Sequence, residues 1–331
     1  MSLYLHGLGH FHPETEITNR FLTELDIGTN DEWIMERVGI RSRRSVLPLD
    51  YIRETRNRDP AGALDAAMYT HAETGTAAAE MALERAGIPR QSVGMVIAGG
   101  CRPDTLSPAD ACNIAQALEI EAPSFDVNSA CTSFNVGLYM LSGMRPERLP
   151  DYILLVSPES LTMTVDYSDR SASVLWGDGT IAAVVSPRVP SRIRILGNTM
   201  ESSPAGADKV VVPQFGHFRQ EGRTVQMFAI KKTVRVLRHL QKTYTEEGRR
   251  LHFVGHQANL RMLETVCERA GIPPERHHHN VVDFGNTGSA GAPSVISMNW
   301  DRFTDGDDIA VVGVGSGLTW SGYLLRFGED S

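Results

Sequence analysis

The strongest constraint on the fold is an order of predicted strands and helices that occurs twice along the chain. In each pass a short apolar strand leads to a helix, a second strand ends at a turn of small and polar residues, and a further strand closes the unit. The first pass runs through strand 95–99, helix 108–118, strand 123–127, the helix after Cys131 and strand 152–156. The second runs through strand 251–255, helix 259–270, strand 280–283, a helix through Ile296 and strand 309–312. The sequence therefore predicts two homologous α/β halves, with mostly parallel sheets and helices outside them.

Cys131 lies where the first pass turns from a strand into a helix. The strand 123–127 ends just before it, and Phe134, Leu138 and Leu141 then recur at helical spacing. Free backbone N–H groups and the positive end of the helix dipole favour an anion there, so we expect this thiol to ionise more readily than an ordinary cysteine. The alternative is a small apolar cysteine packed under the helix.

Two polar residues follow strands of the second pass. His256 comes directly after strand 251–255, and Asn286 lies in the turn after strand 280–283. In open α/β sheets the ligand crevice lies at the carboxyl ends of the strands, so both side chains are expected to converge on Cys131. A cysteine nucleophile needs an imidazole within reach and a third group that fixes the geometry. Taken singly, each residue also fits a purely structural role, since an Asn beside Gly is a common turn former.

Composition limits the classes of function. With 331 residues, 41% of them hydrophobic and 22% charged, the chain can bury a substantial core. Its net charge of −8 argues against nucleic-acid or membrane-surface binding. The amino terminus lacks the features of a signal peptide, and no apolar run is long enough to cross a membrane. The four cysteines form no CxxC pair, so we expect reduced thiols in a cytoplasmic protein without a metal site.

The amino-terminal part, before the first pass, has its own predicted elements. They are a strand at 1–9, a helix at 31–37 capped by Asn30 or Asp31, a polar segment at 48–71 that fits a long loop or an inserted excursion, and an Ala-rich helix at 74–86. Gly87 and Pro89 end the last of these helices.

Six motifs resemble those of the 3-oxoacyl-ACP synthase III enzymes (ACP, acyl carrier protein), a family of the thiolase superfamily. They are NDEWIMERVGIR (30–41), DVNSACTSF (126–134), WGDG (176–179), HQANLR (256–261), GNT (285–287) and GSGLTW (315–320), and the similarity runs from roughly Leu3 to Phe327. The resemblance implies a thiolase-like α/β fold, in which two duplicated halves form a five-layer αβαβα sandwich. Residues 1–186 would carry the cysteine and residues 187–331 the His and Asn. It also implies a homodimer.

The resemblance further implies a mechanism. Cys131 would take an acyl group from an acyl-CoA thioester, with the backbone N–H groups of Cys131 and Ser316 holding the oxyanion. His256 and Asn286 would then donate hydrogen bonds to a malonyl thioester, normally malonyl-ACP. Loss of CO₂ would leave an enolate that attacks the acyl group, as in the start of fatty-acid synthesis. No cofactor is implied, because decarboxylation itself supplies the carbanion.

Three groups of residues match substrate contacts of the family. Trp33, Arg37, Arg170 and Asn259 match residues that contact coenzyme A. Leu106, which would close the acyl pocket across the dimer, and Trp176 match positions that shape the pocket for the starter. Arg261 matches a basic residue that docks the acidic carrier protein, and Arg269 would extend that basic patch.

Several positions depart from the family pattern. Thr132-Ser133 replaces Ala-Gly after the cysteine, and Gly315-Ser316-Gly317 replaces three glycines. These departures leave a second interpretation open: a pathway-specific ketosynthase or acyltransferase of natural-product biosynthesis, with an unusual acyl donor or acceptor. A non-catalytic partner subunit is a third interpretation, against which the intact Cys131, His256 and Asn286 argue.

Overall fold

The computed structural model describes residues 3–328, so the first two residues of the strand expected at 1–9 lie outside the described chain. The strands are β1 (Leu3–Phe11), β2 (Thr15–Thr18), β3 (Ser42–Ser45), β4 (Val93–Ala98), β5 (Ser124–Asp126), β6 (Tyr152–Glu159), β7 (Gly179–Ser186), β8 (Ile193–Ser202), β9 (Val210–Val211), β10 (Arg219–Gln220), β11 (Arg250–Gly255), β12 (Asp307–Gly315) and β13 (Thr319–Phe327). The helices are α1 (Asn19–Glu24), α2 (Asp31–Arg37), α3 (Leu49–Thr55), α4 (Gly62–Ala66), α5 (His71–Ala86), α6 (Asp110–Ala117), α7 (Ser133–Gly143), α8 (Arg170–Ser173), α9 (Gly222–Tyr244), α10 (Leu260–Ala270), α11 (Val281–Phe284) and α12 (Gly291–Met298). Among the helices described, none combines the length and apolar character that a membrane span requires.

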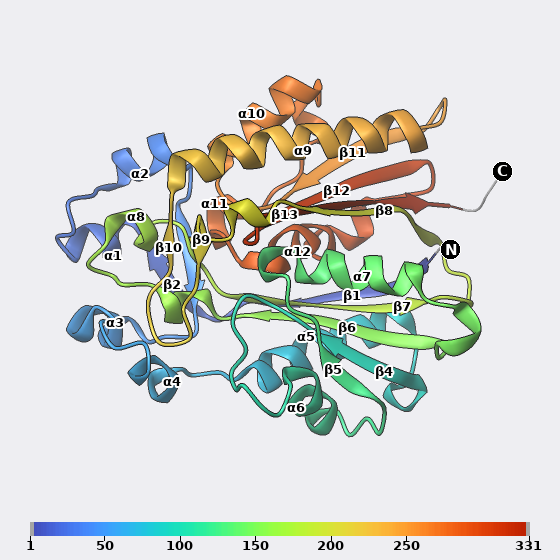
Figure 1. The fold of residues 1–331 in the computed structure, drawn as a ribbon, viewed down its shortest axis with the longest axis horizontal. Coiled ribbons are helices and arrows are strands. Elements are labelled where there is room, and N and C mark those ends of the chain that lie inside the picture. Colours follow the sequence, from blue (N-terminus) through green and yellow to red (C-terminus); the bar gives the residue numbers. More distant parts are fainter. Residues whose placement is uncertain (1–2, 329–331) are drawn as a thin grey trace.

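Nine strands form one sheet in the order β11-β12-β13-β8-β1-β7-β6-β4-β5. Its two parts meet at a short pairing of β1 with β8: four strands come from the second half of the chain and five from the first. Figure 1 shows α7 and α12 between the two parts, α9 and α10 beyond one part, and α5 and α6 beyond the other. This is the expected five-layer αβαβα arrangement. The boundary at 186/187 lies between β7 and β8 and stays a prediction.

The sheet is mixed, so the expectation of mostly parallel sheets was wrong. Parallel pairing joins β4 to β5, β4 to β6, and β11 to β12. The strands at the centre, β1, β7, β8 and β13, pair antiparallel. All four strands lie outside the two passes recognised in the sequence. The repeat pattern therefore gave no information about the direction of these strands.

Helix α5 packs closely on β1 because the residues at their contact have small side chains or none. Thr70 and Glu73 form a capping box at its start, and Gly87 ends it in the left-handed conformation with φ +64°. A Cβ at Gly7 or Gly9 of β1 would lie 2.1 Å from a backbone oxygen of α5. The helix therefore approaches the strand to a distance that only glycine permits. It also begins three residues before the predicted start at Thr74.

Two predicted segments were wrong. The polar segment 48–71 is not a continuous loop, because it contains α3 and α4; each buries one apolar residue, Ile52 and Ala63, a signal too weak to show as periodicity. The segment 280–283, predicted as a strand, instead enters the short helix α11. Gln257 Oε1 accepts the N–H groups of Asn280 and Val281, which gives these donors a partner outside any sheet.

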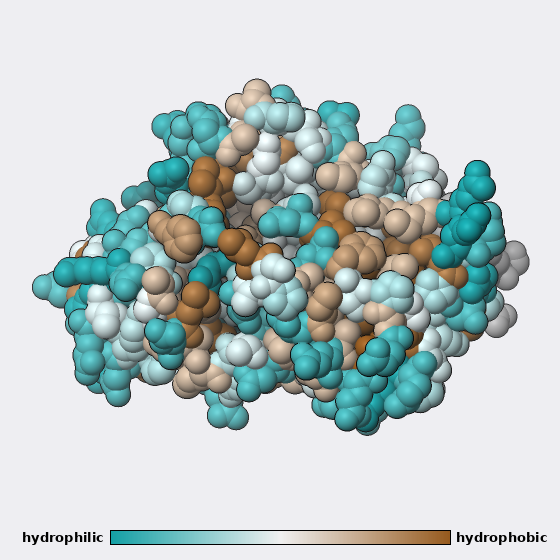
Figure 2. Space-filling view, turned by 60° about the horizontal axis from the view of Figure 1, so that its bottom comes forward, coloured by the Kyte–Doolittle hydropathy of each residue, from teal (hydrophilic) through white to brown (hydrophobic). Residues whose placement is uncertain are grey.

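Figure 2 shows one face of the molecule in space-filling form. Apolar residues lie on it as separate patches among hydrophilic ones. Scattered apolar residues of this kind are ordinary on a folded surface.

Candidate active site

Cys131 lies at the carboxyl end of β5, in the 3₁₀ turn Ala130–Thr132 that leads into α7. Ala130 has φ +47°, an unfavourable conformation for a residue with a side chain, of the kind that clusters at functional sites. The hydroxyl of Ser133 accepts the N–H of Ser129 and donates to the carbonyl of Ala130, which fixes the turn from both sides. The nucleophile candidate is thus half-buried on a rigid turn.

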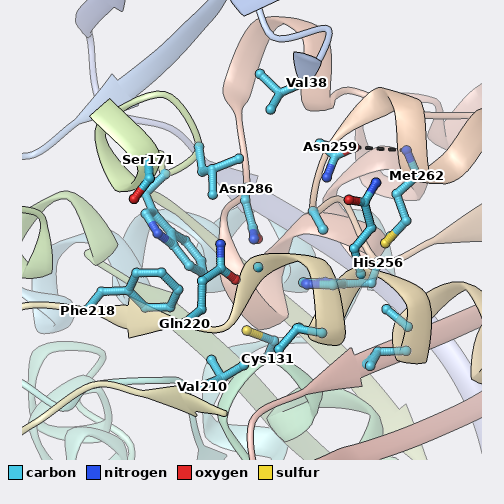
Figure 3. Close-up of a pocket in the computed structure, with 18 of the residues that line it drawn as sticks. Val38, Cys131, Ser171, Val210, Phe218, Gln220, His256, Asn259, Met262 and Asn286 are labelled. Atoms are coloured by element: carbon cyan, nitrogen blue, oxygen red, sulfur yellow. Dashed lines mark hydrogen bonds between the residues drawn. The ribbon is translucent and has the colours of Figure 1, made fainter. Parts of the chain in front are cut away.

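His256 and Asn286 line the same cavity as Cys131 (Figure 3). This cavity has a volume of about 290 Å³. His256 follows the last residue of β11, and Asn286 follows α11. Both side chains are buried and line the cavity, so they have little contact with bulk water. The structure thus brings together three residues that lie far apart in the sequence.

The backbone of Asn286 is held by the segment before β7. Its N–H donates to the carbonyl of Leu175 at 2.8 Å, and its carbonyl accepts the N–H of Gly177 at 3.1 Å. Its side-chain Oδ1 accepts the N–H of Gly288 at 3.1 Å. Because the acceptor end of the amide is engaged, the donor end, Nδ2, is left for a ligand in the cavity.

The sulfur of Cys131 lies in a thiolate-stabilising environment. Its pKa is lowered, first by the hydrogen bond that it shares with the Cys101 thiol and then by His256, against the opposing effect of burial. The direction agrees with the expectation from the helix start. The largest cause, however, is Cys101, to which the sequence reasoning gave no role.

Cys101 and Glu159 are the site residues that the sequence reasoning missed. Cys101 Sγ lies 3.5 Å from Cys131 Sγ, and Glu159 Oε1 lies 3.3 Å from Cys101 Sγ. Burial, followed by the proximity of Cys131, raises the pKa of the Glu159 carboxyl to about 7. Both residues come at the carboxyl end of a first-half strand, β4 and β6, so the rule that located His256 could have found them.

Three of the four residues predicted to contact coenzyme A line the cavity, and the fourth lies against one of them. The three are Trp33, Arg37 and Asn259. The Arg170 guanidinium lies over the Trp33 ring at 4.9 Å, and that of Arg37 at 6.0 Å. Asn259 also caps α10, since its Oδ1 accepts the N–H of Met262 (Figure 3). Arg170 stacks on a cavity residue without lining the cavity itself.

The predicted acyl-pocket residues are separated. Trp176 is buried, lines the cavity and packs edge-on against Phe218 at 4.6 Å between ring centres. Leu106 lies elsewhere, on a loop, with 79% of its surface exposed. Ser316, predicted to complete the oxyanion hole, lines the cavity, and its hydroxyl donates to the carbonyl of Val210.

The two predicted docking residues both lie on α10, but the guanidinium of one is engaged in contacts within the chain and the other residue is exposed. Arg261 donates to the carbonyls of Met35 and Glu36 and pairs with Glu264, so its guanidinium holds α10 against α2. Arg269 is exposed, beside a groove whose other basic residues belong to α9.

One cluster in residues 3–328 brings three possible metal ligands together: His71, Asp104 and Asp110. His71 already bonds Asp110 at 2.8 Å and the hydroxyl of Ser160 at 3.1 Å. Its two ring nitrogens are therefore engaged in a buried network that ties the start of α5 to the start of α6.

Comparison with known proteins points to one family. The family model of 3-oxoacyl-(acyl-carrier-protein) synthase III matches residues 125–204, and that of its C-terminal part matches residues 240–327. A beta-ketoacyl-(acyl-carrier-protein) synthase III of Oceanobacillus iheyensis is 32% identical over 99% of this chain and all of its own length. One of Syntrophomonas wolfei is 33% identical over 100% of this chain and 99% of its own.

Solved structures agree in fold as well. The 3-oxoacyl-(acyl-carrier-protein) synthase III of Aquifex aeolicus superposes with a TM-score of 0.86 at 28% identity, over 98% of this chain and 100% of that one. A priming beta-ketosynthase of a polyketide biosynthetic pathway gives 0.82 at 27% identity, over 99% and 97%. With the cysteine, imidazole and carboxamide in one cavity of this fold, the chain belongs to the 3-oxoacyl-(acyl-carrier-protein) synthase III family.

Proposed function

We propose that this chain is an acyltransferase that condenses an acyl-CoA starter with a malonyl thioester, normally malonyl-ACP, as in the initiation of fatty-acid synthesis. The observation that supports this best is the convergence of Cys131, His256 and Asn286 on one cavity. The lowered pKa of the Cys131 sulfur favours the thiolate, which is the form that attacks a thioester.

The first step is acyl transfer to Cys131. The thiolate attacks the carbonyl carbon of the acyl-CoA, and the backbone N–H groups of Cys131 and Ser316 stabilise the oxyanion that forms. One such donor is typically worth about 3–4 kcal/mol in the transition state. The carbon–sulfur bond to coenzyme A then breaks, and coenzyme A leaves as a thiolate that takes a proton from solvent.

The second step is decarboxylative condensation. His256 and Asn286 donate hydrogen bonds to the thioester carbonyl of the malonyl group; the engaged Oδ1 of Asn286 favours Nδ2 as its donor. The bond to the carboxylate breaks, CO₂ leaves, and its electron pair forms an enolate. The enolate carbon attacks the acyl carbon, and the Cys131 thiolate departs. No metal or organic cofactor takes part in this sequence.

The cavity entrance supports a coenzyme A thioester as the starter. Trp33 offers a large face for stacking an adenine, and Arg37 and Arg170 next to it offer positive charge for phosphates. For the carrier protein, Arg269 and the basic residues of α9 around the neighbouring groove provide a local positive surface on a chain of net charge −8. Arg261 contributes mainly through the position of α10.

We further propose that the enzyme is a cytoplasmic homodimer. The family position that Leu106 matches supports the dimer, because that position closes the acyl pocket across two copies; in the single chain the Leu106 side chain is 79% exposed. The second candidate function is a pathway-specific synthase with an unusual starter, and the likeness to a priming ketosynthase of a polyketide pathway favours it.

Intact-protein mass spectrometry tests the main proposal. Acetyl-CoA should add one acyl group to the wild-type chain and none to Cys131→Ala. Malonyl-ACP should then release the group as a 3-oxoacyl product. Asn286→Ala should keep the acyl adduct but lose the product. Adduct formation without condensation from any short or branched starter would favour the second function, and the absence of any adduct would contradict both.

A further inference from the structure

Cys101 offers its thiol to the reacting sulfur. It follows β4 and lies 3.5 Å from Cys131 Sγ, within hydrogen-bond distance for two sulfur atoms. A thiol is a weak donor, but a thiolate is a strong acceptor, and hydrogen bonds to a charged partner are about twice as strong as neutral ones. The Cys101–Cys131 contact is therefore most favourable when Cys131 carries the charge.

The position of Cys101 is fixed by its backbone. Its N–H donates to Glu159 Oε2 at 3.0 Å. The two residues before it are glycines wedged against neighbouring strands: a Cβ at Gly99 would lie 2.0 Å from the Val127 carbonyl oxygen, and one at Gly100 would lie 2.6 Å from that of Pro158. Only glycine fits at these two positions, and the close approach that they allow places the Cys101 sulfur beside the sulfur of Cys131.

The Cys101 proton has a second acceptor. Glu159 Oε1 lies 3.3 Å from Cys101 Sγ and also accepts the N–H and hydroxyl of Ser289, both at 2.8 Å. One S–H proton therefore has two acceptors on different sides. Because a hydrogen bond follows the greater negative charge, the state of Cys131 decides which acceptor receives it.

We propose that Cys101 is a further catalytic residue, whose thiol donates a hydrogen bond to Cys131 while that sulfur is a thiolate and turns to Glu159 while it is acylated. This inference rests on the acyl-cysteine chemistry of the proposed function. The proton stays on Cys101 throughout, so no bond forms or breaks at this residue. Glu159 acts through Cys101 and is a positioning residue.

The hydrogen bond assists both steps of the reaction. At a pH below the pKa of Cys131 it increases the fraction of reactive thiolate before acyl transfer, and there this gain exceeds the accompanying loss of nucleophilicity, for which the Brønsted slope is only about 0.4–0.5. In the condensation Cys131 is the leaving group, and a thiolate of lower pKa leaves faster. The Cys101 thiol, although a weak donor, therefore affects both the acyl transfer to Cys131 and the later departure of Cys131 in the condensation.

The pH profile of Cys131 alkylation tests the proposal without requiring turnover. Wild type, Cys101→Ala and Cys101→Ser are treated with iodoacetamide between pH 4 and 9, and adducts on Cys131 are quantified by peptide mass spectrometry. Loss of the donor in Cys101→Ala should raise the midpoint by about one pH unit or more, which lowers the thiolate fraction roughly tenfold well below the midpoint. Cys101→Ser retains a donor and should stay near wild type.

Two further measurements keep the outcomes separate. Cys112→Ala removes an exposed thiol on α6 and should leave the midpoint unchanged, which controls for cysteine loss as such. In single-turnover experiments at a pH where Cys131 is fully ionised, Cys101→Ala should still slow condensation. An unchanged midpoint in folded Cys101→Ala would overturn the role of Cys101. Normal alkylation of wild type with no acyl transfer from any acyl-CoA would instead overturn the proposed function.

Discussion

Replacing Gly177 with alanine tests how firmly Asn286 has to be held. Gly177 lies in the turn before β7, and its N–H donates to the carbonyl of Asn286. A Cβ there would lie 2.1 Å from the carbonyl oxygen of Phe284, two residues before Asn286. The backbone on both sides of this contact is buried or hydrogen-bonded, so the methyl group has no free space to enter.

The size of the effect follows from that distance. Real Cβ atoms essentially never approach a heavy atom more closely than 3.0 Å, so the two segments have to separate by about 1 Å. A displacement of about 1 Å of a positioned group costs on the order of 100-fold in rate. The packing strain itself should lower the free energy of unfolding by about 1–3 kcal/mol, which leaves a folded protein.

The two half-reactions separate this effect from general damage. Acyl transfer to Cys131 does not use Asn286, so Gly177→Ala should form the acyl adduct at close to the wild-type rate, measured by rapid-quench mass spectrometry. Condensation with malonyl-ACP should fall by roughly 100-fold. Gly143→Ala, at the end of α7 with no atom near the added Cβ, is the matched control and should affect neither step. Equal loss of both half-reactions, or retained condensation, would refute the reasoning.

Three other perturbations test separate parts of the molecule. Trp33→Ala should raise the KM for acyl-CoA roughly tenfold without changing kcat, as expected for a lost contact of about 1.4 kcal/mol; initial-rate kinetics with an unchanged KM would place coenzyme A elsewhere. Burial lowers the pKa of His12 to about 3, so the unfolded chain takes up the proton first, and the free energy of unfolding should fall by about 3 kcal/mol between pH 6.5 and pH 4 from this residue. His12→Phe should reduce that slope in urea titrations, and an identical slope would show that His12 is not its source. Leu106→Trp should narrow starter choice toward acetyl in competition between acetyl-CoA and hexanoyl-CoA, and an unaltered preference would argue against a role in the acyl pocket.

Much of the site could be predicted because each of its residues carries a local signal. Cys131, His256 and Asn286 each come after an apolar run or in a glycine-rich turn, and the order of elements assigns them to the same edge. Asn30 and Gly87 likewise mark helix ends through local chemistry, and the structure confirms both caps.

The errors arose where the decisive contacts are distant in sequence. The segment 280–283 holds two valines that suit a strand, but it forms a helix, and its first N–H groups are accepted by the side chain of Gln257, more than twenty residues earlier. No sequence pattern around Cys101 or Glu159 indicates that their side chains are in contact, because the two residues are 58 positions apart in the chain. Propensity and periodicity describe neighbours along the chain and cannot report such pairs.

The central layer of α7 and α12 has a consequence for how substrate range can be changed. The turns that carry Cys131 and follow Asn286 join this layer, which contacts both parts of the sheet, so mutations there disturb the whole molecule. Much of the cavity wall, including Val210, Phe218 and Gln220, instead comes from the surface segment around β9 and β10. Laboratory evolution should therefore begin with Phe218 and Gln220 of that hairpin, and leave the backbone of Val210 in place because its carbonyl accepts the hydroxyl of Ser316.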